Sequence, residues 1–180
     1  MEDNVFDLID WSSNDIQEDF EPTDYSIPIN CGGKAKITEI IRDTGTTNNQ
    51  EIKNIFKIKM VMDSVLPETD EKTTKAAKNR HLDVTYFVSP NKFQTPNEVV
   101  DEIKKDLNTI GCPLVKPKTQ LDENQLYDYI TVHLNSLKDK IVDVRCYPGK
   151  KKPGGRIPQK TKIVKRDVTA KKKEKTNVPF

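Results

Sequence analysis

The sequence predicts a mainly β domain with helices inserted between its third and fourth strands. Short segments in which apolar and polar residues alternate recur along the chain, and two longer segments with helical apolar spacing lie between the third and the fourth. The composition limits the size of this domain. Of 180 residues, 34% are apolar and 32% are charged, and the mean hydropathy is −0.74. Such a chain has room for one domain of about 100–150 residues, and we expect disordered tails besides.

Charge is distributed unevenly along the chain. Residues 1–24 contain nine acids and no base, whereas residues 150–175 contain twelve bases and two acids. We therefore expect an acidic, mostly disordered segment at 1–24, a folded domain at 25–168 and a basic, disordered tail at 169–180. This polarity indicates a polyanionic partner, for which the acidic segment is an internal competitor.

One apolar motif interrupts the acidic segment. Val5, Leu8 and Ile9 form a short helical stripe that ends at Trp11. A motif of this kind either docks on a partner protein or packs on the protein's own domain, and the sequence leaves both interpretations open.

An antiparallel hairpin is predicted first. Residues 34–42 alternate, with Ile37 and Ile41 on one face and Arg42 on the other. A turn of small polar residues separates this strand from a second at 52–62. The second strand has an apolar face and a basic face, formed by Phe56, Ile58, Met60 and Met62 on one side and by Lys53, Lys57 and Lys59 on the other.

A third strand is predicted at 80–89, after a charged and polar segment at 63–79 in which we expect a loop. Phe87 lies on the polar face of this strand. The apolar face comprises Leu82, Val84, Tyr86 and Val88.

Two helices follow, and each is marked by a capping box. Thr95 and Glu98 form the first box, and its helix ends at Gly111; Asp122 and Gln125 form the second. The apolar stripes of the two helices comprise Val99, Ile103, Leu107 and Ile110, and then Leu126, Ile130, Leu134 and Leu137.

The last two strands are predicted at 140–147 and 161–168, and a flexible, strongly basic loop joins them. Three strands, two helices and two further strands fit a small five-stranded barrel of the oligonucleotide/oligosaccharide-binding kind, the OB-fold. A β-sandwich fragment or another α+β sheet fits the same order.

Motifs of the common catalytic classes are missing from the sequence. Cys31-Gly32-Gly33-Lys34 lacks the spacing of a phosphate-binding loop and precedes a predicted strand. Cys31, Cys112 and Cys146 form no Cys-x-x-Cys pair, so we expect reduced thiols rather than a zinc site. We expect a protein that is not an enzyme and has no cofactor and no metal, with a small magnesium-dependent nuclease as the weaker alternative.

The sequence also bears on location. The N-terminus lacks the basic-then-apolar order of a signal peptide, and no stretch approaches the ~20 apolar residues of a membrane span. We therefore expect a cytoplasmic protein without membrane contact.

Bases and aromatic residues recur together on the outward faces and in the basic loop. Single-stranded nucleic acid needs this mixture, because cations attract its backbone while rings stack on its bases. For the strand lysines alone, solvation of an exposed face is the favoured explanation, whereas the basic loop and the last strand favour nucleic acid. The candidate nucleic-acid-binding residues are Lys53, Lys57, Lys59, Phe87, Phe93, Arg145, Tyr147, Lys150, Lys151, Lys152, Arg156, Lys160 and Lys162.

The layout resembles a group of bacteriophage single-stranded-DNA-binding proteins with an OB-fold barrel. Their acidic, Trp-containing opening is similar to Ile9-Asp10-Trp11-Ser12 here, and their first strand is similar to the segment Gly33-Lys34-Ala35-Lys36-Ile37. The resemblance implies a protein that coats single-stranded DNA during phage replication or recombination, in the cytoplasm of the host. RNA in place of DNA stays open, as do contacts with replication or recombination proteins.

The C-terminus carries a second resemblance. Val178-Pro179-Phe180 resembles the tip of bacterial single-stranded-DNA-binding proteins, which recruits replication and repair enzymes, although that tip follows aspartates. We therefore take Trp11, Pro179 and Phe180 as candidate partner-binding residues. The main alternative is a non-enzymatic interaction module, such as a phage structural or host-takeover factor, whose basic loop binds an acidic protein or RNA.

Overall fold

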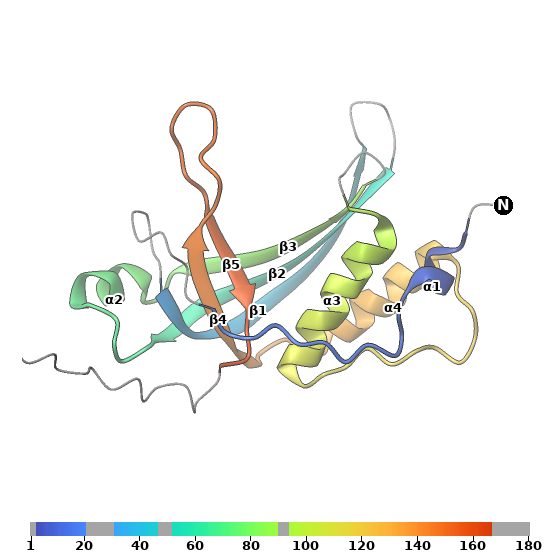
Figure 1. Cartoon of the computed structure of the whole chain (residues 1–180), viewed down its shortest axis with the longest axis horizontal. Coiled ribbons are helices and arrows are strands. Elements are labelled where there is room, and N and C mark those ends of the chain that lie inside the picture. Colours follow the sequence, from blue (N-terminus) through green and yellow to red (C-terminus); the bar gives the residue numbers. More distant parts are fainter. Residues whose placement is uncertain (1–2, 21–30, 47–51, 90–93, 167–180) are drawn as a thin grey trace, which may run out of the picture.

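Five strands form one antiparallel sheet with the order β3-β2-β1-β4-β5 (Figure 1). The computed structural model describes residues 3–20, 31–46, 52–89 and 94–166. The central strand β1 pairs with β2 on one side and with β4 on the other, and β3 and β5 form the two edges. The bounds of the strands are Cys31–Thr46 for β1, Ile52–Val65 for β2, His81–Val88 for β3, Ile141–Pro148 for β4 and Gln159–Ile163 for β5.

This topology confirms a mainly β domain with five strands and with helices between the third and the fourth. The sheet curls, so that β3 and β5 approach each other, but no ladder joins these two edges within the described residues. The sequence left open whether the predicted barrel is closed. In the structure the sheet is not closed into a barrel, because it is open between β3 and β5.

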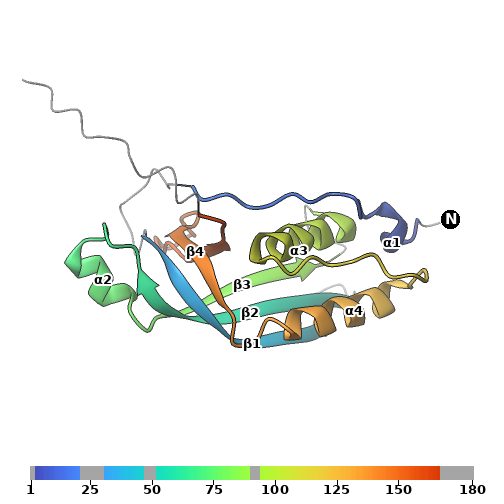
Figure 2. The same cartoon turned by 90° about the horizontal axis from the view of Figure 1, so that it is seen from below.

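Both predicted capping boxes begin helices where the sequence places them. In α3 (Pro96–Ile110) the carboxylate of Glu98 accepts from the amide of Thr95 at 2.7 Å, and Gly111 ends the helix at φ 78°. In α4 (Glu123–Asn135) Asp122 and Gln125 exchange two hydrogen bonds of 2.9 and 3.0 Å. The helix α3 packs against β3 and α4 against β1, so the core lies between them and the sheet (Figures 1 and 2).

A β-bulge in β1 changes which of its side chains face the core. Ile37 pairs with Met60 and Glu39 pairs with Lys59, so Thr38 is an extra residue that reverses the alternation beyond it. The prediction for Ile41 and Arg42 is therefore wrong. Arg42 is the residue on the core side, with its guanidinium 5.9 Å from the ring centre of Phe56 and 6.0 Å from that of Tyr127.

Several elements differ from the sequence prediction, since β1 (Cys31–Thr46) is longer at both ends than predicted and β2 continues to Val65. The helix α2 (Glu71–Ala77) lies in the segment expected to be a loop, where its two turns are too short to show a period. Asp70 caps this helix by accepting from the amide of Thr73 at 2.8 Å. The strand β5 begins at Gln159 and ends at Ile163, earlier than predicted.

The acidic segment differs most from its expectation. Residues 3–20 pack on the domain instead of being disordered, because α1 (Val5–Leu8) buries Val5 and Phe6 against α3 and α4. Ile9 is also buried, and the indole of Trp11 donates to the carbonyl of Phe6 at 3.0 Å. Of the two interpretations of this motif, the structure supports packing on the protein's own domain.

Beyond α1 the chain runs along α3 to the end of β5 (Figure 2). The amide of Gln17 donates to Thr109 Oγ1 at 2.8 Å, and Glu18 and Lys165 form a parallel bridge. The predicted basic tail at 169–180 lies outside the described residues. None of the described helices is both long and apolar enough to cross a membrane.

Candidate functional site

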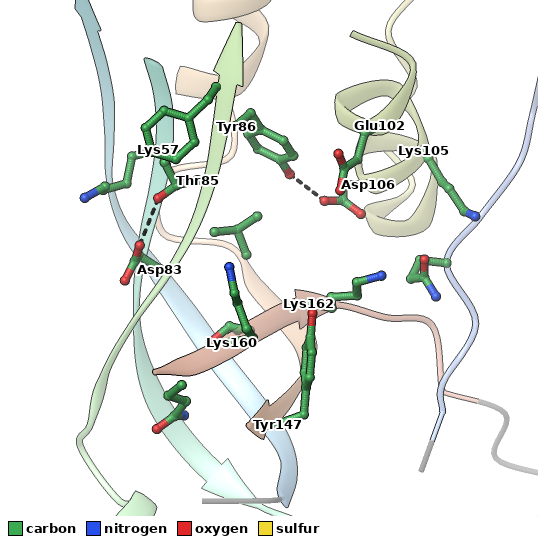
Figure 3. Close-up of a pocket in the computed structure, with 15 residues that line it drawn as sticks. Lys57, Asp83, Thr85, Tyr86, Glu102, Lys105, Asp106, Tyr147, Lys160 and Lys162 are labelled. Atoms are coloured by element: carbon green, nitrogen blue, oxygen red, sulfur yellow. Dashed lines mark hydrogen bonds between the residues drawn. The ribbon is translucent and has the colours of Figure 1, made fainter. Parts of the chain in front are cut away.

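A cavity of about 410 Å³ lies where the sheet is open, between β3, β5 and the helix α3 (Figure 3). Because β3 and β5 do not pair, side chains from both edges line this space. Its lining comprises Gln17, Lys57, Asp83, Val84, Thr85, Tyr86, Phe87, Glu102, Lys105, Asp106, Tyr147, Gln159, Lys160, Thr161 and Lys162.

The strand register explains how these side chains meet. Lys57 pairs with Thr85 across β2 and β3, on the face opposite the buried Phe56 and Tyr86. Directly opposed residues of an antiparallel pair share a face. Tyr147 pairs with Lys160 across β4 and β5 in the same way, so the outer faces of both sheet edges reach the cavity.

Five of the predicted site residues come together here. They derive from strands far apart in the chain, and they supply two rings and three ammonium groups. Phe87 is 41% exposed, whereas Tyr147 is partly covered, and its burial raises the pKa of the phenol. The five residues are Lys57, Phe87, Tyr147, Lys160 and Lys162.

Three other predicted residues lie on the sheet but outside the cavity. Lys59 forms an exposed ion pair with Glu39 at 3.0 Å, and Lys53 lies near the far end of the β1–β2 hairpin. Arg145 is only 8% exposed and donates to Asp19 at 2.6 and 3.0 Å. Its structural partner is thus the acidic segment.

The basic loop stands away from the sheet. It connects β4 to β5 as a long hairpin that projects from the molecule (Figure 1). A turn at its tip is held by the amide of Lys152, which donates to the carbonyl of Arg156 at 2.8 Å. The predicted residues Lys150, Lys151, Lys152 and Arg156 are all exposed in this loop.

Of the predicted partner-binding residues, the structure describes Trp11. Trp11 is half-buried, with the ammonium of Lys104 5.7 Å from its ring centre. Pro179 and Phe180 lie outside the described residues, and so does Phe93.

Sequence reasoning missed the contribution of α3. Glu102, Lys105 and Asp106 follow each other at the spacing of one helical face, which flanks the apolar stripe at Asp106 and borders the cavity. That spacing was the available signal. This face of α3 could not be assigned to the site without knowing that β3 and β5 approach each other beside it.

A hydrogen bond joins two lining residues of the cavity, one on β3 and one on α3. The hydroxyl of Tyr86 donates to Asp106 at 2.5 Å (Figure 3). Burial raises the pKa of Asp106 to about 6, and the bond from Tyr86 opposes this shift only in part. Burial, together with the charge of Asp106, also raises the pKa of Tyr86 well above its usual range.

Both signs of charge are present in the cavity. Four lysines face three acids: Lys57, Lys105, Lys160 and Lys162 against Asp83, Glu102 and Asp106. Lysines can hold phosphate oxygens, rings can stack on bases, and carboxylates can accept from the exocyclic amines of bases. Protonation of Asp106 makes the cavity more positive.

The acidic segment borders the cavity at Tyr147. Gln17 is one of the lining residues, and the ring of Phe20 packs against Tyr147 with centroids 5.4 Å apart. Residues 17–20 thus cover one side of a predicted stacking ring. Among the described residues, no group of three His, Cys, Asp or Glu side chains converges to hold a metal ion.

Comparison with known proteins adds no assignment. No model of a protein family matches the chain, and no curated protein gives a significant match to its sequence.

Proposed function

We propose that this protein binds single-stranded DNA without catalysis, and that the cavity between β3 and β5 is the centre of its binding site. One observation carries the proposal: Phe87 of β3 and Tyr147 of β4, from opposite sides of the central strand β1, line the same cavity with Lys57, Lys160 and Lys162. Bases stack on such rings at about 1–3 kcal/mol each, while the lysines neutralise phosphates.

The strand order supports the finer fold assignment that we propose, an open barrel of the OB type. OB-folds are five-stranded, partly open barrels, and they bind oligonucleotides on the face of strands 2 and 3 and through the loops between strands 1 and 2 and between strands 4 and 5. In this chain Lys57 and Phe87 lie on β2 and β3, and the basic loop connects β4 to β5. The candidate residues thus occupy two of those regions.

A role in coating single strands during phage replication or recombination is part of the proposal. It rests on the resemblance in sequence layout, and the cavity supports the binding step alone. We propose that the bound single-stranded DNA crosses the cavity and continues along the projecting loop, where it contacts Lys150, Lys151 and Lys152.

A fluorescence titration of the full chain with oligo-dT and with a matched duplex tests the proposal. We expect quenching of tyrosine emission by the single strand, tighter binding to it than to the duplex, and affinity that falls steeply with salt. Phe87→Ala and Tyr147→Ala should each weaken binding by about ten-fold. Val132→Ala is the control, because Val132 is an apolar residue of α4 that is 71% exposed and does not line the cavity.

Equal, weak binding to both nucleic acids, unchanged in Phe87→Ala and Tyr147→Ala, would refute the proposal. It would favour the second candidate, an interaction module that uses the basic loop. The observation behind that candidate is the projection of the loop from the sheet, with its bases exposed (Figure 1). In that case replacing Lys150, Lys151 and Lys152 by Gln abolishes binding to an acidic protein or RNA, and the cavity variants bind normally.

A further inference from the structure

Two of the three cysteines face each other across the central ladder. Cys31, the first residue of β1, is the direct register partner of Cys146 in β4. Opposed residues of an antiparallel pair have Cα atoms about 4.5–5.5 Å apart and side chains on the same face. Disulfides span Cα separations of about 4.4–6.8 Å, so the two strands already hold these cysteines within bonding range.

Both thiols are buried and free. Cys31 is 4% exposed and Cys146 is 0% exposed, and neither belongs to a disulfide. Cys112, the third cysteine, is only partly buried and follows α3, away from this ladder. Any intramolecular pairing compatible with the fold therefore selects Cys31 and Cys146.

Two guanidinium groups lie on the opposite face of β1. A Cβ atom built on Gly32, which alternates with Cys31 and so points away from the thiols, would approach Arg145 Nη1 and Arg166 Nη2 to 3.0 Å each. Their charges favour the thiolate of Cys31 less than burial and the hydrogen bond to Cys146 oppose it. A hydrogen bond from Cys31 lowers the pKa of Cys146, whereas the same bond and burial raise the pKa of Cys31. This asymmetry makes Cys146 the nucleophile of the pair and Cys31 the thiol that responds to it.

We propose that Cys31 and Cys146 form a redox modification site, in which peroxide converts them into a reversible disulfide between β1 and β4. The thiolate of Cys146 attacks one peroxide oxygen, and its sulfur becomes a sulfenic acid as the other oxygen leaves as hydroxide. The sulfur of Cys31 then attacks the sulfenic sulfur, its proton joins the departing oxygen, and water leaves. Two thiols and one hydrogen peroxide thus give one disulfide and two waters, and a dithiol reductant reverses the oxidation by exchange.

The bond would join the start of β1 to the strand that carries Arg145 and Tyr147. It would keep β4 paired to β1 where Arg145 contacts Asp19 and Tyr147 contacts Phe20. The inference does not depend on the proposed function, since it rests on the register of the β1–β4 ladder and on the state of the two thiols.

Oxidation of the full-length folded chain with hydrogen peroxide tests the site. We expect the intact mass to fall by about 2 Da, and dithiothreitol to restore it. Digestion without reductant, followed by mass spectrometry, should yield one cross-linked species that joins the peptides of Cys31 and Cys146. The peptide map uses the wild-type chain, so it needs no variant to fold.

Three variants sharpen the assignment. Cys112→Ser should oxidise as the wild type does, whereas Cys31→Ser and Cys146→Ser should lose the mass change and the cross-linked species. A cross-link through Cys112, a dimer linked between chains, oxygen addition without a disulfide, or no reaction would each overturn the proposal.

Discussion

The ring of Phe20 packs edge-on against the ring of Tyr147, with centroids 5.4 Å apart and planes at 79°. The preceding residue, Asp19, binds Arg145, which lies two positions before Tyr147 in β4. The carboxylate of Asp19 therefore pairs with the cation of Arg145, and the ring of Phe20 packs on the ring of Tyr147. A nucleotide presents the same two groups, a phosphate and a base.

Phe20→Ala should tighten binding of single-stranded DNA at low salt by a few fold, because it uncovers Tyr147 as a stacking surface. Fluorescence anisotropy with labelled oligo-dT measures the change. The control is Leu8→Ala, an exposed apolar residue of the same segment that does not line the cavity. Unchanged or weaker binding in Phe20→Ala would show that Phe20 does not compete with the strand. Deleting residues 1–24 is a poorer test, because it also removes Val5, Phe6 and Ile9 from the core.

Asp19→Ala should lower the free energy of unfolding by about 3 kcal/mol, because it leaves the buried guanidinium of Arg145 without its partner. Urea unfolding followed by circular dichroism measures this loss. Asp15→Ala, an exposed acid of the same segment, should change the stability by less than about 0.5 kcal/mol. An equally small change in Asp19→Ala would contradict a structural role for the pair.

Asp106 should make the protein less stable as the pH rises through about 6. The folded state raises the pKa of Asp106 from 3.8 to about 6, so between these values the folded chain binds the proton more tightly than the unfolded chain does. The stabilisation is full below the unfolded pKa and is lost as the pH passes the folded one. Asp106→Asn should therefore match the wild type near pH 3 and exceed it at pH 8, by about 1–3 kcal/mol. Parallel urea curves at both pH values measure this, and an identical pH dependence of the two proteins would contradict it.

Lys160→Gln and Lys162→Gln should each reduce the dependence of DNA affinity on salt. One phosphate contact on a single strand contributes about 0.7 to the slope of log affinity against log salt concentration. Titrations at four salt concentrations give this slope. Lys34→Gln is the matched control, because Lys34 is exposed, pairs with Asp143 at 3.3 Å and does not line the cavity. Slopes that fall equally in all three variants would indicate a general charge effect rather than contacts in the cavity.

Local signals predicted much of the fold. The capping residues of α3 and α4 act within one helical turn, so the sequence shows both starts directly. The alternation of β2 and β3 likewise placed Lys57 and Phe87 on the outer face. The bulge at Thr38 could not be predicted, because one inserted residue leaves the apolar and polar pattern readable in either register.

The composition of the site depended on distant contacts. Tyr147 and Phe87 were identified from their own strands, but nothing local shows that β3 and β5 approach each other beside α3. The acidic face of α3 was missed for the same reason. The outward face that Arg145 shares with Tyr147 predicted a contact with nucleic acid. Its partner in the structure, Asp19, could not be predicted, because it lies far away in a segment whose acidity indicated disorder.

The two ladders of β1 also bear on the order of folding. The ladder to β2 closes a short hairpin, whereas the ladder to β4 joins segments separated by β2, α2, β3, α3 and α4. Pairings between distant segments form late, because the loss of chain entropy precedes the contacts that offset it. We therefore expect β1–β3 and the helices to assemble first, and the return of β4 and β5 to limit the rate. Pulsed hydrogen exchange during refolding would then protect the amides of β2 before those of β4, and the cavity would be the last feature of the molecule to appear.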